Sequence, residues 1–246
     1  MVVKSLCSTE RIALHTRAGW IRLRWLLGRC WHEADDPNAG KPGVLTVGLC
    51  FMRISGGECK GRRLRVPKSG LRPTQDQVRE ALFSMLADFV PGAHFLDLFA
   101  GSGAVGLEAL SRGASRATWV ESHAPTVKVI KENLAELALD GGFALRGDAL
   151  RVDLAGLPGA PFDVIFADPP YAEVRRDENG AFLVDPVVGQ LVDRVVDGNA
   201  LKPEGFLVIE QAKRGAVLSR PGWALLRDRT YGTARILIYQ RSDSGA

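Results

Sequence analysis

The stretch HFLDLFAGSGAVG, residues 94–106, decides the fold class of this chain. It begins with an apolar run typical of a buried strand, and the glycines Gly101, Gly103 and Gly106 follow at once. Apolar residues continue through Leu110, which indicates a helix. Glycines at this spacing let the backbone turn tightly, approach a ligand closely and pack the helix against the strand. The segment therefore predicts a strand, a ligand-binding loop and a helix of an α/β sheet.

The glycines alone are compatible with two ligands, and the acidic residues around the loop distinguish between them. Glu121 ends the next apolar run, roughly 20 residues after the loop, as expected for a carboxylate that binds a ribose. That position suits both a nicotinamide dinucleotide and S-adenosylmethionine. Asp97 stands just before the glycines, where its charge would repel a pyrophosphate but suits a ligand with an amino-acid tail. The loop therefore favours S-adenosylmethionine.

A second motif, FDVIFADPPY at residues 162–171, predicts a site for a planar amine. Its apolar run is typical of a strand buried on both faces, and the prolines end it abruptly. Asp168 offers a carboxylate and Tyr171 an aromatic face. Pro169 and Pro170 offer rigid carbonyl groups with no competing N–H. Together these groups could hold an exocyclic NH2 group and stack its base, although an ordinary strand terminator is the alternative.

Four acidic residues end four successive strand-like runs, namely Asp97, Glu121, Asp148 and Asp168. A doubly wound sheet brings the ends of its parallel strands to one edge, and ligands bind there. We therefore expect these acids to share one edge of the sheet. Asp148 could accept a hydrogen bond from the adenine amine of the cofactor, but a helix cap or a turn aspartate explains it equally well.

These motifs resemble those of one known family. The segment Asp97–Gly113, the tetrad Asp168–Tyr171 and the basic segment Met52–Glu80 are similar to the RsmD family of 16S ribosomal RNA guanine-N2 methyltransferases. The loop and tetrad occur in many amino-methylating enzymes, so the basic segment points to this family in particular. The resemblance implies a class I methyltransferase fold, which is Rossmann-like and has a seven-stranded sheet whose last strand is antiparallel.

The motifs and the resemblance assign three sets of site residues. The expected catalytic residues, for direct methyl transfer to the N2 of a guanine, are Asp168, Pro169, Pro170 and Tyr171. The residues expected to bind S-adenosyl-L-methionine are Asp97, Phe99, Gly101, Gly103, Gly106, Glu121, Asp148 and Ala149. The residues expected to bind RNA are Arg53, Arg62, Arg63, Arg65, Arg72 and Arg79.

Positive charge gathers ahead of these motifs. The net charge of the chain is +4, and residues 52–80 contain eight basic residues against three acidic ones. Residues 53–55 and 62–66 flank a glycine-containing turn, which predicts a small β-hairpin that presents arginines. Such a block is the expected footprint of a phosphate backbone, and a solubilising surface is the alternative. Its position directly before the catalytic domain favours nucleic acid.

The sequence patterns divide the chain into three parts. Residues 1–51 match nothing in the family pattern, and three interpretations compete for them. They are an extension from an upstream start site, a disordered or weakly helical basic arm, and an amphipathic helix that binds a membrane surface or RNA; we favour the first two. Residues 52–73 are expected to form the basic hairpin, and residues 74–246 the methyltransferase domain.

Within the methyltransferase domain, periodicity predicts further elements. A helix with Thr74 as its N-cap should bury an apolar face, a turn is expected at residues 201–205, and the last two strands should flank residues 231–233. The expected apolar face of that helix consists of Val78, Ala81, Leu82, Met85, Leu86 and Phe89.

The remaining expectations concern metals, location and alternative functions. A zinc site is not expected, because the cysteines and histidines show no paired ligand spacing. No apolar run reaches the roughly 18 residues of a membrane span, and no secretory signal is evident, so we expect a cytoplasmic protein. We also expect this protein to be a monomer. Its substrate would be 16S ribosomal RNA, free or in an assembling subunit. A DNA adenine-N6 methyltransferase and a non-methylating nucleotide-binding protein remain alternatives.

Overall fold

The computed structural model describes residues 12–16, 19–23, 52–66, 76–170 and 176–242. The chain divides into two compact units, residues 1–50 with 68–70 and residues 51–67 with 71–246. In the first unit, β1 (Ile12–Thr16) pairs antiparallel with β2 (Gly19–Leu23). The second unit contains every other helix and strand among the described residues. None of the described helices is long and apolar enough to span a membrane.

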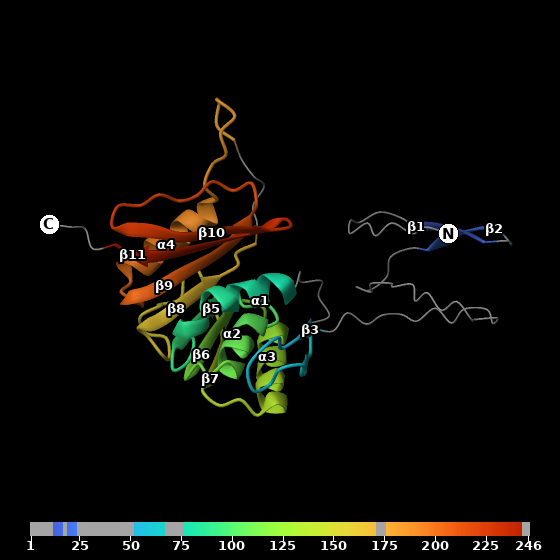
Figure 1. Ribbon diagram of the computed structural model, residues 1–246, viewed down its shortest axis with the longest axis horizontal. Helices are drawn as coiled ribbons and strands as arrows, with labels where there is room; N and C mark the ends of the chain where they lie inside the picture. The colour runs from blue at the N-terminus through green and yellow to red at the C-terminus, as the bar shows by residue number, and fades with distance from the viewer. Residues whose placement is uncertain (1–11, 17–18, 24–51, 67–75, 171–175, 243–246) are drawn as a thin grey trace. The chain divides into compact units, whose positions relative to one another are not determined.

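A seven-stranded sheet forms the centre of the second unit, in the order β10-β11-β9-β8-β5-β6-β7 (Figure 1). The strands from β7 to β9 are parallel neighbours, and β11 runs antiparallel to both β9 and β10. The expected class I methyltransferase fold with an antiparallel last strand is therefore confirmed. The strands are β5 (His94–Leu98), β6 (Arg116–Glu121), β7 (Gly142–Arg146), β8 (Phe162–Ala167), β9 (Leu201–Ala212), β10 (Trp223–Tyr231) and β11 (Ala234–Arg241).

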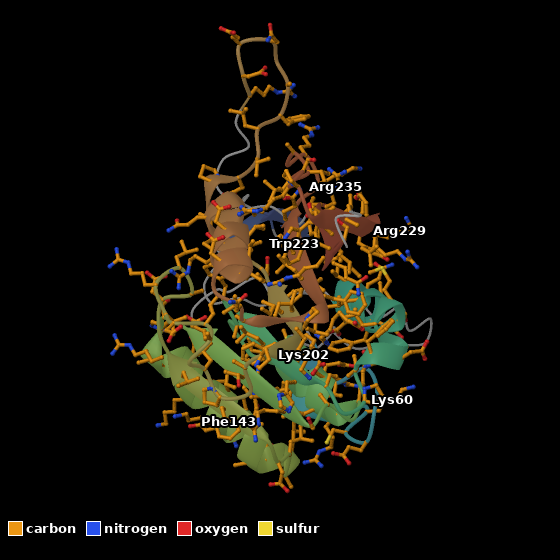
Figure 2. All side chains as sticks on the ribbon, turned by 90° about the vertical axis from the view of Figure 1, so that its left-hand side faces the viewer. Lys60, Phe143, Lys202, Trp223, Arg229 and Arg235 are labelled. Atoms are coloured by element: carbon orange, nitrogen blue, oxygen red, sulfur yellow. The ribbon has the colours of Figure 1, made fainter. Side chains whose placement is uncertain are left out.

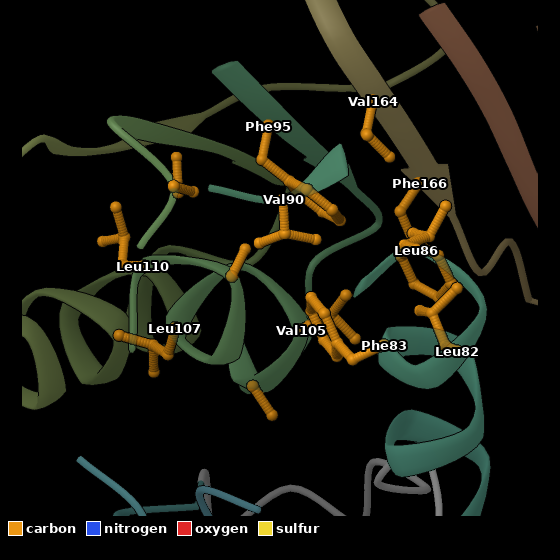
Figure 3. Close-up of a cluster of buried hydrophobic side chains, with 14 of the residues drawn as sticks. Leu82, Phe83, Leu86, Val90, Phe95, Val105, Leu107, Leu110, Val164 and Phe166 are labelled. Carbon is orange, nitrogen blue, oxygen red and sulfur yellow. The ribbon is translucent and has the colours of Figure 1, made fainter. Parts of the chain in front are cut away.

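Helices cover both faces of this sheet and create two hydrophobic cores. One core lies under α1 (Asp76–Met85), α2 (Ala104–Ser111) and α3 (Ala124–Leu137), and the other lies under α4 (Pro186–Asp197). Figure 3 shows the first core, where side chains of α1 and α2 meet Phe95 and Phe166 of the sheet. Because both faces are buried, the central strands are apolar along their length, as their sequences indicated.

The predicted basic hairpin forms, with strands of only two residues each. β3 (Met52–Arg53) pairs antiparallel with β4 (Arg63–Leu64). The chain between these strands turns at Gly57, whose φ of 78° lies in the left-handed region. Met52, Ile54 and Leu64 are buried in the first core. The hairpin is therefore packed against the helices α1, α2 and α3 rather than extended into solvent.

Two local predictions were wrong. Phe89 is 52% exposed, because α1 ends at Met85 and Phe89 lies in the following 3-10 turn η1 (Ala87–Phe89); Phe83 is buried instead. The turn expected at residues 201–205 is part of β9, where the register with β8 shifts between Phe162 and Val164. A bulge accommodates a proline and a glycine that would otherwise interrupt a strand.

Candidate active site

The four predicted acids lie at the carboxyl edge of four adjacent strands. Asp97 is the penultimate residue of β5, and Glu121 is the last residue of β6. Asp168 directly follows β8, and Asp148 comes two residues after β7. Since β8, β5, β6 and β7 are parallel neighbours, the sheet brings these residues to one edge, as the sequence indicated.

Asp97 is the most deeply buried of these acids. Its side chain is 1% exposed, and its Oδ2 accepts a hydrogen bond of 3.1 Å from the backbone N–H of Gly106. Burial raises the pKa of Asp97 well above its ordinary value, and the negative charges of Asp168 and Glu121 raise this pKa further. The hydrogen bond from Gly106 opposes that shift. A positively charged ligand group here would therefore be electrostatically favourable.

The glycine loop adopts a backbone that most residues avoid. Phe99, Gly101 and Gly103 have φ values of 58°, 51° and 74°, all in the left-handed region. A Cβ atom on Gly103 would lie 2.8 Å from Cγ1 of Ile130. One on Gly106 would lie 2.4 Å from Nε1 of Trp119. Gly103 and Gly106 are therefore required by packing against α3 and β6, whatever their role toward a ligand.

Glu121 is anchored between the glycine loop and the start of α3. Its Oε2 accepts from the backbone N–H of Gly101 at 3.0 Å, and its Oε1 accepts from the backbone N–H of His123 at 2.7 Å. These bonds fix the carboxylate at the carboxyl end of β6, beside the loop. A loop whose shape depends on Glu121 would lose ligand affinity if this residue were removed.

The contacts of Asp148 are those of the turn aspartate that the sequence left as an alternative. Its Oδ1 accepts from the backbone N–H of Leu150 at 2.9 Å, and its Oδ2 lies 3.4 Å from Nε of Arg151. The neighbouring Ala149 is 3% exposed and packs in the second core. The structure thus explains Asp148 without a ligand, and an adenine contact remains a prediction.

The tetrad predicted to bind an amine, residues 168–171, lies partly outside the described residues. Asp168 is half-buried, Pro169 is buried and Pro170 is exposed, directly after the last residue of β8. The negative charge of Asp168 contributes to the raised pKa of Asp97, so the two carboxylates lie within electrostatic range of each other. Tyr171 and the predicted RNA-binding Arg72 lie outside the described residues.

The hairpin arginines divide into two groups. Arg53 and Arg63 are exposed and face each other across β3 and β4. Arg62 donates to the backbone carbonyl of Glu136 at 2.8 Å, and Nε of Arg65 lies 2.8 Å from Oε2 of Glu136. The hydrogen bond with Glu136 raises the pKa of Arg65. Arg62 and Arg65 therefore lie along the last turns of α3, away from the carboxyl edge.

The prediction that Arg79 binds RNA was wrong. Its side chain is fully buried, and its Nε lies 3.1 Å from Oε2 of Glu108, which is fully buried as well. Glu108 also accepts from the backbone N–H of Ser55 at 2.8 Å and pairs with Arg112 at 2.8 Å. A charge this deeply buried needs such partners and cannot contact a phosphate group.

Sequence reasoning missed this buried cluster, which we call the Glu108 cluster and define as Ser55, Arg79, Glu108 and Arg112. The cluster joins the hairpin, α1 and α2. One signal was present: Glu108 is the only charged residue in the otherwise apolar stretch from Ala104 to Leu110. A charged side chain inside a buried helix indicates a partner elsewhere in the fold.

Comparison with known proteins identifies the family. A family model described as Conserved hypothetical protein 95 matches residues 52–240, more than half of the chain. The chain belongs to this family. The match begins at the first residue of β3 and ends in β11, so it includes both the hairpin and the whole sheet.

Two curated relatives of this chain have methyltransferase names. The chain is 35% identical over 196 residues to Ribosomal RNA small subunit methyltransferase D of Escherichia coli, and the match covers 79% of this chain and 92% of the relative. It is 33% identical over 194 residues to the Putative rRNA methyltransferase YlbH of Bacillus subtilis, covering 77% and 99%. The resemblance to the RsmD family is confirmed by these relatives.

A solved structure supports the same family assignment. The putative methyltransferase yhhF from Escherichia coli superposes with a TM-score of 0.64 at 34% identity, covering 78% of this chain and 98% of that chain. Nearly the whole of that solved protein thus has a counterpart in this chain.

Proposed function

We propose that this protein transfers a methyl group from S-adenosylmethionine to the exocyclic N2 of a guanine in 16S ribosomal RNA. The observation that carries the proposal is the placement of Asp168 and Pro169 directly after β8, beside Asp97 and the glycine loop that follows β5. The first two residues of the predicted tetrad thus lie next to the predicted cofactor loop, on neighbouring strands. The named relatives support ribosomal RNA as the substrate. We further propose that the protein acts as a monomer in the cytoplasm.

The charges at the edge of the sheet fit a cationic cofactor. Asp97 lies close enough to Glu121 and Asp168 for their charges to raise its pKa, and a bound cation would offset this repulsion. S-adenosylmethionine carries a sulfonium and an ammonium group, and it supplies an electrophilic methyl group when bound. The glycine loop, Asp97 and Glu121 would hold it, with the turn at Asp148 as a further contact.

The residues of the tetrad would prepare the amine of guanine for attack. This amine is a poor nucleophile, because its lone pair is delocalised into the ring. The Asp168 carboxylate and the Pro169 carbonyl would accept its two N–H hydrogens and favour a pyramidal nitrogen, while Tyr171 stacks on the flipped base. Alignment of this kind supplies roughly 7 to 11 kcal/mol in well-arranged systems. Asp168 then need not act as a strong base.

The Asp168→Ala variant tests this assignment. It removes an acceptor for the amine hydrogens and should reduce the single-turnover rate of methylation of a 16S ribosomal RNA transcript by about 100-fold or more. Calorimetry should find that its affinity for S-adenosylmethionine falls far less than the rate of methylation does. Asp153→Ala, which removes an exposed carboxylate from the loop before β8, is the matched control and should methylate normally.

Three results would contradict the proposal. A near-normal rate for Asp168→Ala would make the tetrad a strand terminator. Methylation mapped to a base other than guanine would contradict the substrate. Stabilisation of the protein against heat by a nicotinamide dinucleotide, but not by S-adenosylhomocysteine, would instead favour a dehydrogenase.

A further inference from the structure

A second basic block lies in the C-terminal part of the chain. Residues 81–246 are net acidic as a whole. Between Lys213 and Arg241, however, the chain contains seven basic residues and only one acidic residue, Asp228. This block is richer in net positive charge than the hairpin segment and contains no residue of the predicted site.

The topology of the sheet brings part of this block to the catalytic edge. β9 runs parallel to β8, with Ala167 opposite Ile209, so both strands end at the same edge as Asp168. Lys213 and Arg214 directly follow the end of β9. The backbone N–H of Lys213 donates to the carbonyl of Thr233 at 2.8 Å, which ties this edge to the turn between β10 and β11.

Some of these cations already have partners. Arg235 pairs with Asp228 at 2.6 Å, and this bond lowers the pKa of Asp228. Arg220 pairs with Asp193, and Arg241 lies over the ring of Trp223, 5.9 Å from its centroid. The remaining four are exposed and form no ion pair with any residue that the structure describes. They are Lys213, Arg214, Arg227 and Arg229.

Two of these four residues lie on the face of the sheet that carries α1. Arg227 lies opposite Ile238 and Arg229 opposite Ile236, and residues directly opposite each other on antiparallel strands share a face. Ile236 and Ile238 are buried in the core under α1, α2 and α3. Figure 2 shows Arg229 on the C-terminal strands, on the same side of the view as α1.

Distance and chemistry both suit RNA that is bound at the tetrad. β10 is three strands away from β8, which corresponds to about 14 Å at the usual spacing of paired strands. Arginine is well suited to phosphate, because its guanidinium is permanently charged and donates in a fixed fork. Arg62 and Arg65 of the hairpin, in contrast, lie along the last turns of α3, and Arg79 is buried.

We propose that Lys213, Arg214, Arg227 and Arg229 form a second RNA-binding surface, which contacts the phosphate backbone next to the methylated guanine. We call it the C-terminal basic surface. The proposal rests on the proposed function and names a further contact of the same substrate. It places RNA on the β9–β11 side of the tetrad as well as on the hairpin.

Two double variants test the C-terminal basic surface, Lys213→Ala with Arg214→Ala, and Arg227→Ala with Arg229→Ala. Binding of the full-length protein to a 16S ribosomal RNA transcript is measured at several salt concentrations. Each lost phosphate contact reduces the slope of log K against log salt by about 0.7 to 0.9. Each double variant should therefore flatten the slope by about 1.5. Unchanged affinity for S-adenosylmethionine will show that the variants are folded.

A matched control distinguishes a specific contact of this surface from the effect of lowering the net charge of the protein. Lys128→Ala with Lys131→Ala removes the same charge from exposed positions on α3, at the other end of the sheet, and should leave the slope unchanged. Equal effects of all three double variants, or the parental slope in both test variants, would overturn the proposal. In the second case, the protein could still methylate guanine, and the surface would serve another acidic partner. If the parent neither binds nor methylates the transcript, the proposed function itself fails.

Discussion

At the scale of single residues, Asp97 has the most unusual environment in the site. It is buried beside two other carboxylates, and its pKa is raised well above the ordinary value of an aspartate. In the folded protein without ligand, Asp97 therefore binds a proton over a pH range in which it is ionised in the unfolded chain. By linkage, this group lowers the stability of the protein as the pH rises above the ordinary pKa of about 4.

The Asp97→Asn variant should remove this dependence. Its amide oxygen can still accept from the backbone N–H of Gly106, but no charge is buried when the pH rises. Relative to the parent, the variant should gain thermal stability at pH 8 compared with pH 5 while losing affinity for S-adenosylmethionine. Thermal unfolding curves across that pH range and calorimetry would measure both effects. Identical pH profiles for the two proteins would mean that Asp97 is ionised in the folded state as well.

The positions of the acids could be predicted from the sequence, whereas their surroundings could not. Each acid follows an apolar run, and parallel strands end at one edge of a sheet. The order of strands and helices along the chain was therefore enough to predict that the four acids share this edge. The need for glycine at Gly106 arises from Trp119, on the next strand. The burial of Arg79 depends on Glu108, which is 29 residues away along the chain. Contacts of this kind follow from packing between elements, which periodicity does not determine.

At the scale of elements, the basic hairpin is fastened to α3 by two kinds of contact. Asn133 is 1% exposed, and its side chain accepts from the backbone N–H of Arg65 at 2.8 Å and donates to the carbonyl of Arg65 at 3.0 Å. The nearby ion pair between Arg65 and Glu136 is largely exposed, with side chains 61% and 48% accessible. The buried amide should contribute far more to hairpin docking than the exposed pair.

Substitution of each partner would separate these contributions. Asn133→Ala leaves two backbone groups without a partner and should cost about 1 to 3 kcal/mol of stability. Glu136→Ala should cost only about 0 to 1 kcal/mol, because exposed ion pairs contribute little. Urea unfolding would give the two values, and hydrogen exchange of residues 52–66 should increase only in Asn133→Ala. A larger effect of Glu136→Ala would show that charge, rather than the buried amide, fastens the hairpin.

At the scale of the whole molecule, the sheet, both hydrophobic cores and the family match all lie at or after Met52. A protein that begins at Met52 should therefore keep its thermal stability and its affinity for S-adenosylmethionine. Its rate of RNA methylation should also equal that of the full chain. Side-by-side melting, calorimetry and single-turnover assays would test this. A loss of RNA affinity alone would assign residues 1–51 a role in substrate binding.

The Glu108 cluster has a consequence for how such enzymes can be recombined. The hairpin supplies Ser55, α1 supplies Arg79, and the helix after the glycine loop supplies Glu108 and, at its C-cap, Arg112. A chimera that received the hairpin and α1 from another enzyme, without a matching acid in α2, would bury an uncompensated cation. Removal of one partner from a buried ion pair typically costs about 3 to 5 kcal/mol, a large part of the stability of a domain. The hairpin and α1 are thus coupled to α2 through the Glu108 cluster, and a hairpin grafted onto this scaffold would have to carry both halves of the buried charge.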